Sequence, residues 1–256
     1  MAELNTIRTA AGTRSAEIDA GLRAHMNKVY ATMSIGMLLT ALAAWAISGL
    51  AVTDVPNGYP VSANTYLTSF GVTIYTTGLK WVIMFAPLAF VFGLSAMINK
   101  MSAATAQLVF YAFSAVMGLS LSSIFLIYTA GSITQVFLIT SIAFAGLSLY
   151  GYTTKKDLSG MGTFLMMGVI GLIVAMVVNI FLQSSAMTFA ISAIGVLIFA
   201  GLTAYDTQSI KTTYLQMAEA GDQEWLGKAA IMGALRLYLD FINMFQFLLY
   251  FMGNQE

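Results

Sequence analysis

Three ionisable residues, Asp206, Arg236 and Asp240, lie inside long apolar stretches of this 256-residue sequence. A charge at the bilayer centre costs about 2.5–3.5 kcal/mol on insertion scales, so such residues are functional candidates by default. Two carboxylates that lie close together do not titrate independently, and the pair takes up protons in two macroscopic steps. When ionised, the pair offers the oxygen ligands that calcium prefers, and it could equally serve magnesium or protons. The residue types therefore predict a pH-sensing and cation-binding site at Asp206 and Asp240.

Arg236 and Asp240 are four residues apart and share one face of the last apolar stretch. If Arg236 extends to the headgroups and marks the membrane boundary, Asp240 lies one turn inside, level with Asp206. The two carboxylates would then face each other across neighbouring helices, with Gln208 and Asn243 as further oxygen ligands for calcium. The alternative is a structural salt bridge between Arg236 and Asp240, with Asp206 bonded to local polar groups.

The composition of the whole chain is that of a membrane protein. Hydrophobic residues make up 59% and charged residues only 9%, whereas an average soluble domain is about 25% charged. A net charge of zero provides no basic surface for nucleic acid. The chain has no cysteine, which excludes disulfides and thiolate sites. It has one histidine, His25, which excludes multi-histidine metal sites. We therefore expect a protein in a lipid bilayer that is not an enzyme and has no cofactor, with His25 as a solvated residue of the N-terminal tail.

Seven stretches are apolar and long enough to cross a bilayer, which takes about 20 residues per helix. These stretches are residues 29–52, 81–98, 105–130, 135–154, 161–182, 187–210 and 230–252. Their continuous apolar character favours helices over the alternating strands of a barrel. The sequence thus predicts an all-α membrane protein with a single seven-helix transmembrane domain at residues 29–252. Residues 1–28 and 253–256 are predicted to be short terminal tails.

Basic residues are distributed unevenly between the connections. With the N-terminus inside, nine lysines and arginines fall in cytoplasmic segments and only Lys80 falls on the opposite side. The positive-inside rule therefore predicts a cytoplasmic N-terminus. Seven spans place the C-terminus outside, whereas a re-entrant last segment would return it to the cytoplasm. The first stretch exceeds the apolar region of about 7–15 residues in a cleavable signal peptide, so we expect a retained helix.

Small residues recur every four positions in two of the stretches. They are Gly36, Thr40, Ala44 and Ser48 in the first, and Ser114, Gly118 and Ser122 in the third. This spacing lets helix backbones approach closely in lipid, so we interpret both ridges as packing surfaces.

Several motifs resemble the Bax inhibitor-1 family. The sequence AYDTQ at residues 204–208 closes one stretch, and LYLDFINMF at residues 237–245 runs through the next. Residues 219–223 and 28–31 also resemble family sequence, and the resemblance covers residues 22–252. It implies a fold of seven helices in which the last is central and wrapped by the other six.

The resemblance also implies a function, a pH-sensitive calcium leak controlled by an aspartate pair that maps to Asp206 and Asp240. Proteins of this family are linked to cell-death suppression and, in bacteria, to modulation of a membrane-bound AAA protease. The alternative is therefore a non-conducting membrane stress regulator with such a protease as its partner. The short tail and the lack of organelle signals favour a bacterial inner membrane.

Arg236 departs from the family pattern that the resemblance suggests, in which this position is usually uncharged. A cation one turn from Asp240 could repel a permeating metal ion, or it could replace the latching arginine that some relatives carry on an earlier helix. The last stretch contains no lysine, which excludes the Schiff base of a seven-helix photoreceptor. The residues before Asp240 lack the glycines of an intramembrane aspartyl protease, which disfavours that class.

Overall fold

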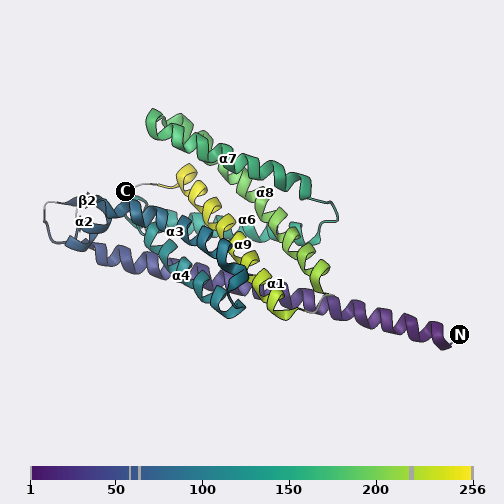
Figure 1. Cartoon of the computed structure of the whole chain (residues 1–256). Coiled ribbons are helices and arrows are strands. Elements are labelled where there is room, and N and C mark those ends of the chain that lie inside the picture. The colour runs from purple at the N-terminus through teal and green to yellow at the C-terminus, as the bar shows by residue number, and fades with distance from the viewer. Residues whose placement is uncertain (1, 58, 63–64, 219–221, 255–256) are drawn as a thin grey trace.

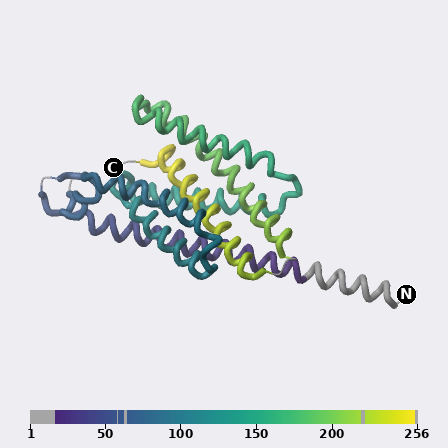
Figure 2. The backbone as a smooth tube through the Cα atoms, viewed as in Figure 1, coloured from purple at the N-terminus to yellow at the C-terminus, as the bar shows by residue number. Residues whose placement is uncertain are grey.

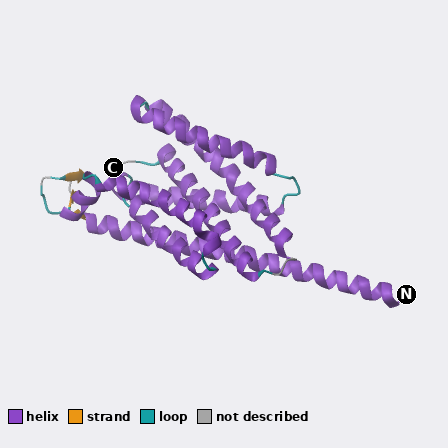
Figure 3. Cartoon of the chain, viewed as in Figure 1, coloured by secondary structure: helices purple, strands orange, loops and turns teal. Residues whose placement is uncertain are grey.

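Long helices dominate the structure, a computed structural model that describes residues 2–57, 59–62, 65–218 and 222–254, with side chains from Glu17 onward (Figures 1 and 3). The long helices are α1 (Ala2–Ala51), α3 (Leu79–Met97), α4 (Ala103–Leu121), α6 (Ala130–Thr153), α7 (Ser159–Leu182), α8 (Ser185–Met217) and α9 (Gln223–Met252). The short elements are β1 (Val52–Thr53), β2 (Pro60–Ser62), β3 (Thr65–Leu67), α2 (Ser69–Thr76), the 3-10 helix η1 (Ile98–Lys100) and α5 (Ile124–Ile127). Helix α1 thus continues through the predicted N-terminal tail.

Six of the helices in the described part of the chain are long and apolar enough to cross a bilayer, which supports an all-α membrane protein. They belong to α1, α3, α4 with α5, α6, α7 and α8. The last predicted span, α9, falls outside this set because Arg236, Asp240, Asn243 and Gln246 interrupt its apolar residues. The seventh span therefore stays a prediction.

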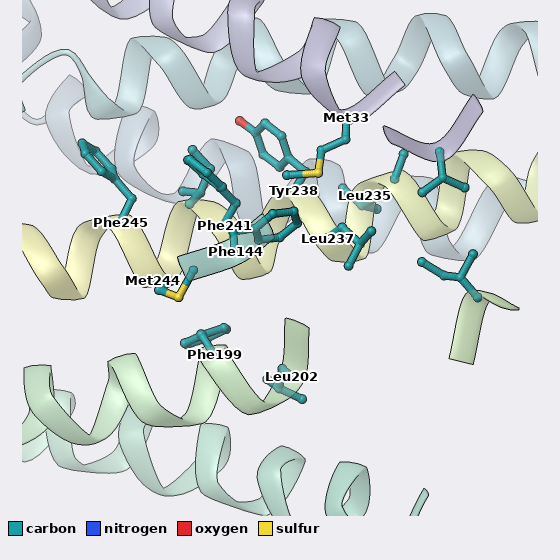
Figure 4. Close-up of a cluster of buried hydrophobic side chains, with 14 of the residues drawn as sticks. Met33, Phe144, Phe199, Leu202, Leu235, Leu237, Tyr238, Phe241, Met244 and Phe245 are labelled. Carbon is teal, nitrogen blue, oxygen red and sulfur yellow. The ribbon is translucent and has the colours of Figure 1, made fainter. Parts of the chain in front are cut away.

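Helix α9 lies among four neighbours and carries much of the core. It packs against α1, α4, α6 and α8, whereas α3 packs mainly on α4 and α7 mainly on α8 (Figure 1). The expectation that all six other helices wrap α9 is therefore not confirmed. Figure 4 shows side chains from the neighbouring helices meeting those of α9: Met33 from α1, Phe144 from α6, and Phe199 and Leu202 from α8.

The predicted ridges of small residues pack α1 against α4. A Cβ added at Gly118 would overlap the carbonyl oxygen of Thr40, and one at Gly36 would lie 2.8 Å from Ser114 Oγ. Thr40 and Ser114 are buried at this contact. The packing interpretation of the ridges is confirmed.

The joins between α3 and α4, α6 and α7, and α8 and α9 lie toward one end of the bundle, which we name the basic end (Figure 2). Strands β1–β3 and the end of α9 lie at the opposite end, where Asn254 N–H donates a hydrogen bond to Ser132 Oγ at 2.9 Å. Helix α9 is continuous, so the described residues contain no re-entrant turn there. Which side of the membrane each end faces stays a prediction.

Two connections differ from the simplest interpretation of the sequence. The third predicted stretch is broken at Ser122, whose hydroxyl donates to the Leu119 carbonyl at 2.7 Å and bonds the Tyr75 hydroxyl at 2.7 Å. The long connection after α1 forms a small antiparallel sheet in the order β1-β3-β2. It then enters α2, where the Thr68 side chain caps the helix by accepting from Gly71 N–H.

Candidate functional site

Asp206 and Asp240 come from α8 and α9, and the packing of these two helices brings their carboxyl groups against each other. Both residues are buried, with 9% and 4% of their surface exposed. Asp240 Oδ2 has no hydrogen-bond partner among the residues that the structure describes. Because buried polar atoms are normally hydrogen-bonded, this oxygen is available to a proton or a cation that the protein does not itself supply. The predicted meeting of the two carboxylates is observed.

Arg236 pairs with the aspartate of the other helix. Its Nη1 lies 3.9 Å from Asp206 Oδ1, and its side chain is 52% exposed. The structural alternative placed this salt bridge within α9, between Arg236 and Asp240. The geometry instead makes Arg236 a link between α8 and α9, beside the carboxyl pair.

A cavity of about 220 Å³ lies at the basic end, next to this ion pair. Arg236 lines it, together with Lys228 and Trp225 of α9 and His25 of α1. His25 is buried, with its ring centroid 4.9 Å from that of Tyr214 on α8, so the expectation of a solvated tail residue is wrong. The reason is that α1 is already helical here and packs against α8.

Beyond the pair, toward the opposite end, lie four aromatic side chains that we name the aromatic layer: Phe137, Phe144, Phe241 and Phe245. Ring centroids of Phe137 and Phe144 each lie 5.5 Å from that of Phe241. Figure 4 shows Phe144 of α6 beside Phe241, with Phe245 farther along α9. An apolar cavity of about 90 Å³ adjoins this layer. No charged residue lines that cavity, and Thr40 provides the only side-chain hydroxyl among its described lining residues.

Hydroxyl groups bond α9 and α8 to other helices near the pair, and of these residues only Thr40 was expected at a helix contact, as part of a packing ridge. Tyr238 on α9 bonds Thr40 on α1 through their hydroxyls at 2.6 Å. Thr207 on α8 bonds Ser148 on α6 at 3.0 Å, and Ser148 in turn bonds the Tyr30 hydroxyl. A buried tyrosine usually needs a partner for its hydroxyl. Tyr238, two residues before Asp240, was therefore the residue in the sequence that could have indicated a hydrogen bond between helices near the pair.

Gln208 does not contribute an oxygen to the pair, which contradicts that part of the predicted ligand set. Its Oε1 accepts from Leu158 N–H and its Nε2 donates to the Lys156 carbonyl, both at 2.8 Å. Gln208 therefore holds the connection between α6 and α7. Asn243 donates through Nδ2 to the Leu239 carbonyl of its own helix at 2.8 Å.

Among the residues that the structure describes, no group of three or more His, Cys, Asp or Glu side chains could hold a metal ion. Calcium takes about 6–8 oxygen ligands. Two carboxylates alone would leave most of these ligands to water or backbone carbonyls.

Long apolar helices around a buried carboxylate pair define an integral membrane protein with an ionisable site between two of its helices. Residues 22–256 match the model of a family described as Inhibitor of apoptosis-promoting Bax1. The chain belongs to this family, the Bax inhibitor-1 family, as the motifs around Asp206 and Asp240 suggested.

Proteins similar to this chain are found in several bacteria. The Inner membrane protein YbhL of Escherichia coli (strain K12) is 45% identical over 238 residues, covering 93% of this chain and 94% of that protein. An uncharacterized protein of Caulobacter vibrioides is 45% identical over 241 residues, covering 93% and 92%. One of Rickettsia prowazekii is 42% identical over 244 residues, covering 95% of each. The similarity thus extends over almost the full length of these relatives.

Proposed function

We propose that this protein is a pH-sensitive cation leak, with calcium as the candidate ion, and that the Asp206–Asp240 pair controls it. The observation that carries the proposal is the contact between two buried carboxyl groups, one of which has an oxygen without a partner in the described structure. We place the protein in a bacterial inner membrane with its N-terminus in the cytoplasm. The name of the similar Escherichia coli protein and the distribution of basic residues support this placement.

The conformation described here corresponds to a closed leak. A protonated pair shares a hydrogen bond and holds α8 and α9 together, whereas two ionised carboxylates repel each other and offer oxygen ligands to a cation. Arg236 stands between the basic-end cavity and the pair, where its charge opposes the arrival of a cation. The aromatic layer closes the other direction, because an apolar constriction excludes ions by dewetting. Opening then requires both ionisation of the carboxyl pair and separation of the rings in the aromatic layer.

Calcium flux into liposomes that contain the purified protein tests the proposal. Asp206→Asn and Asp240→Asn should each change the flux and flatten its dependence on pH between acidic and neutral conditions, since each removes one of the two titrating groups. Asp157→Asn, on the exposed connection between α6 and α7, is the matched control and should retain the wild-type profile. Unchanged flux and pH dependence in both pair variants would reject the leak.

The alternative is a non-conducting stress regulator that modulates a membrane-bound AAA protease and uses the aspartates only to hold helices together. It predicts no flux from the purified wild-type protein, together with co-purification of such a protease from the native membrane. The same liposome measurement therefore separates the two functions.

A further inference from the structure

The cavity at the basic end is walled by hydrogen-bond donors. It lies among α1, η1, α8 and α9, and its volume is about 220 Å³. No carboxylate lines it. Six side chains in its wall can donate hydrogen bonds through N–H or O–H groups: His25, Asn99, Thr213, Trp225, Lys228 and Arg236. A wall with two cations, four further donors and no acid is complementary to an anion.

Among the described residues, these donors have few partners. Within the described part of the chain, none of the six side chains donates a hydrogen bond to another residue, apart from two ion pairs that are both 3.9 Å long. That separation exceeds the 2.7–3.2 Å typical of an N–H···O bond. The partner of Lys228 is Glu224, whose Oε1 already accepts from Ala103 N–H at 2.6 Å. The ammonium and guanidinium groups therefore keep donors for a ligand.

We propose that this cavity binds a phosphate group. Arginine and lysine are the side chains that proteins use for phosphate, and Arg236 and Lys228 both line this one cavity. The cavity is smaller than the roughly 300–1,000 Å³ of pockets for drug-sized ligands, so it suits a single phosphate group. That group belongs either to a free phosphate or to a phospholipid headgroup, since basic pockets between membrane helices also hold headgroups. The proposal does not depend on the leak.

Calorimetric titration of inorganic phosphate into the detergent-purified full chain tests the site. Lys228→Gln and Arg236→Gln should each weaken binding about tenfold or more, because a hydrogen bond to a charged group contributes about that factor. Lys155→Gln is the control, since it removes the same charge from an exposed position outside this cavity and should bind like wild type. Asp206→Asn should tighten binding, because it removes the carboxylate that competes for Arg236. A loss of folding cannot produce this opposite change.

A second arm identifies the source of the phosphate. Delipidated protein is mixed with phosphatidylglycerol or with phosphatidylcholine, and bound lipid is counted by native mass spectrometry for wild type and the same variants. Phosphatidylglycerol retention that Lys228→Gln and Arg236→Gln abolish, without binding of inorganic phosphate, supports the site with a headgroup as its ligand. The proposal is overturned if neither probe binds, or if binding is the same in both cavity variants as in wild type.

Discussion

Arg236 Nη1 lies 3.9 Å from Asp206 Oδ1 on the neighbouring helix, so the arginine of α9 pairs across the α8–α9 contact and not with Asp240 of its own helix. The two carboxylates and this single guanidinium form a compact group between two helices. The same guanidinium also lines the basic-end cavity. Ligand binding in that cavity and protonation of the carboxyl pair can therefore affect each other through the Arg236 side chain.

Replacing Arg236 by glutamine should raise calcium flux several-fold, because it removes a fixed positive charge from the approach to the pair. The free energy of unfolding should fall by about 1–3 kcal/mol, because the loss of the guanidinium leaves the buried Asp206 carboxylate without its cation, although the arginine side chain itself is 52% exposed. Flux into liposomes and thermal unfolding in detergent measure the two quantities. Arg236→Lys keeps the charge and should leak like wild type. A glutamine variant with wild-type or lower flux would show that Arg236 does not oppose cations.

Gly151 on α6 should not tolerate a side chain, because a Cβ there would overlap the carbonyl oxygen of Ala204 on α8. Overpacking a tight contact costs about 1–3 kcal/mol, so Gly151→Ala should lower the free energy of unfolding by that amount. Gly146 lies on the same helix with nothing within 4 Å of an added Cβ. Gly146→Ala should therefore be as stable as wild type, and equal unfolding temperatures for the two variants would contradict the close α6–α8 approach.

Gln208 should control how easily the connection between α6 and α7 opens, because its side chain makes two hydrogen bonds to that backbone. Each bond contributes about 1 kcal/mol, so Gln208→Leu should increase trypsin cleavage after Lys155 and Lys156 by about tenfold or more. Gln216 lies exposed on the same helix and provides the control, as Gln216→Leu should be cleaved at the wild-type rate. Equal cleavage of both variants would mean that Gln208 does not hold the connection.

The carboxyl pair could be predicted from the sequence because ionisable residues are rare in apolar helices and their cost is high. The partner of Arg236 could not. Spacing along one helix offers Asp240 as a neighbour four residues away, whereas the pairing with Asp206 depends on the rotation of α9 against α8, which tertiary packing sets. The role of Gln208 was hidden for the same reason, since its partners are backbone groups of a connection some 50 residues earlier.

Helix positions followed from hydropathy, and the contact between α1 and α4 followed from the ridges that contain Thr40 and Gly118. Two features of the fold did not follow. The break at Ser122 depends on hydrogen bonds from its side chain, one of them to Tyr75 far away in sequence. The burial of His25 depends on α1 starting before the first apolar stretch, where no hydropathy signal marks a helix.

Phe241 should be the main barrier of the aromatic layer, because its ring contacts those of both Phe137 and Phe144. Phe241→Ala should open a path beyond the carboxyl pair and raise calcium flux, while Asp240→Asn in the same background should reduce the gain. Phe164→Ala on α7 removes a ring that is 74% exposed and should leave flux unchanged.

Truncating a buried phenylalanine costs about 3–5 kcal/mol, so the Phe241 variant must first elute as a single species and show a cooperative thermal transition. A folded Phe241→Ala protein with wild-type flux would place the barrier elsewhere. A gain that survives Asp240→Asn unchanged would show that ions cross the layer without passing the carboxyl pair, because a path through the pair must sense the loss of one of its two charges.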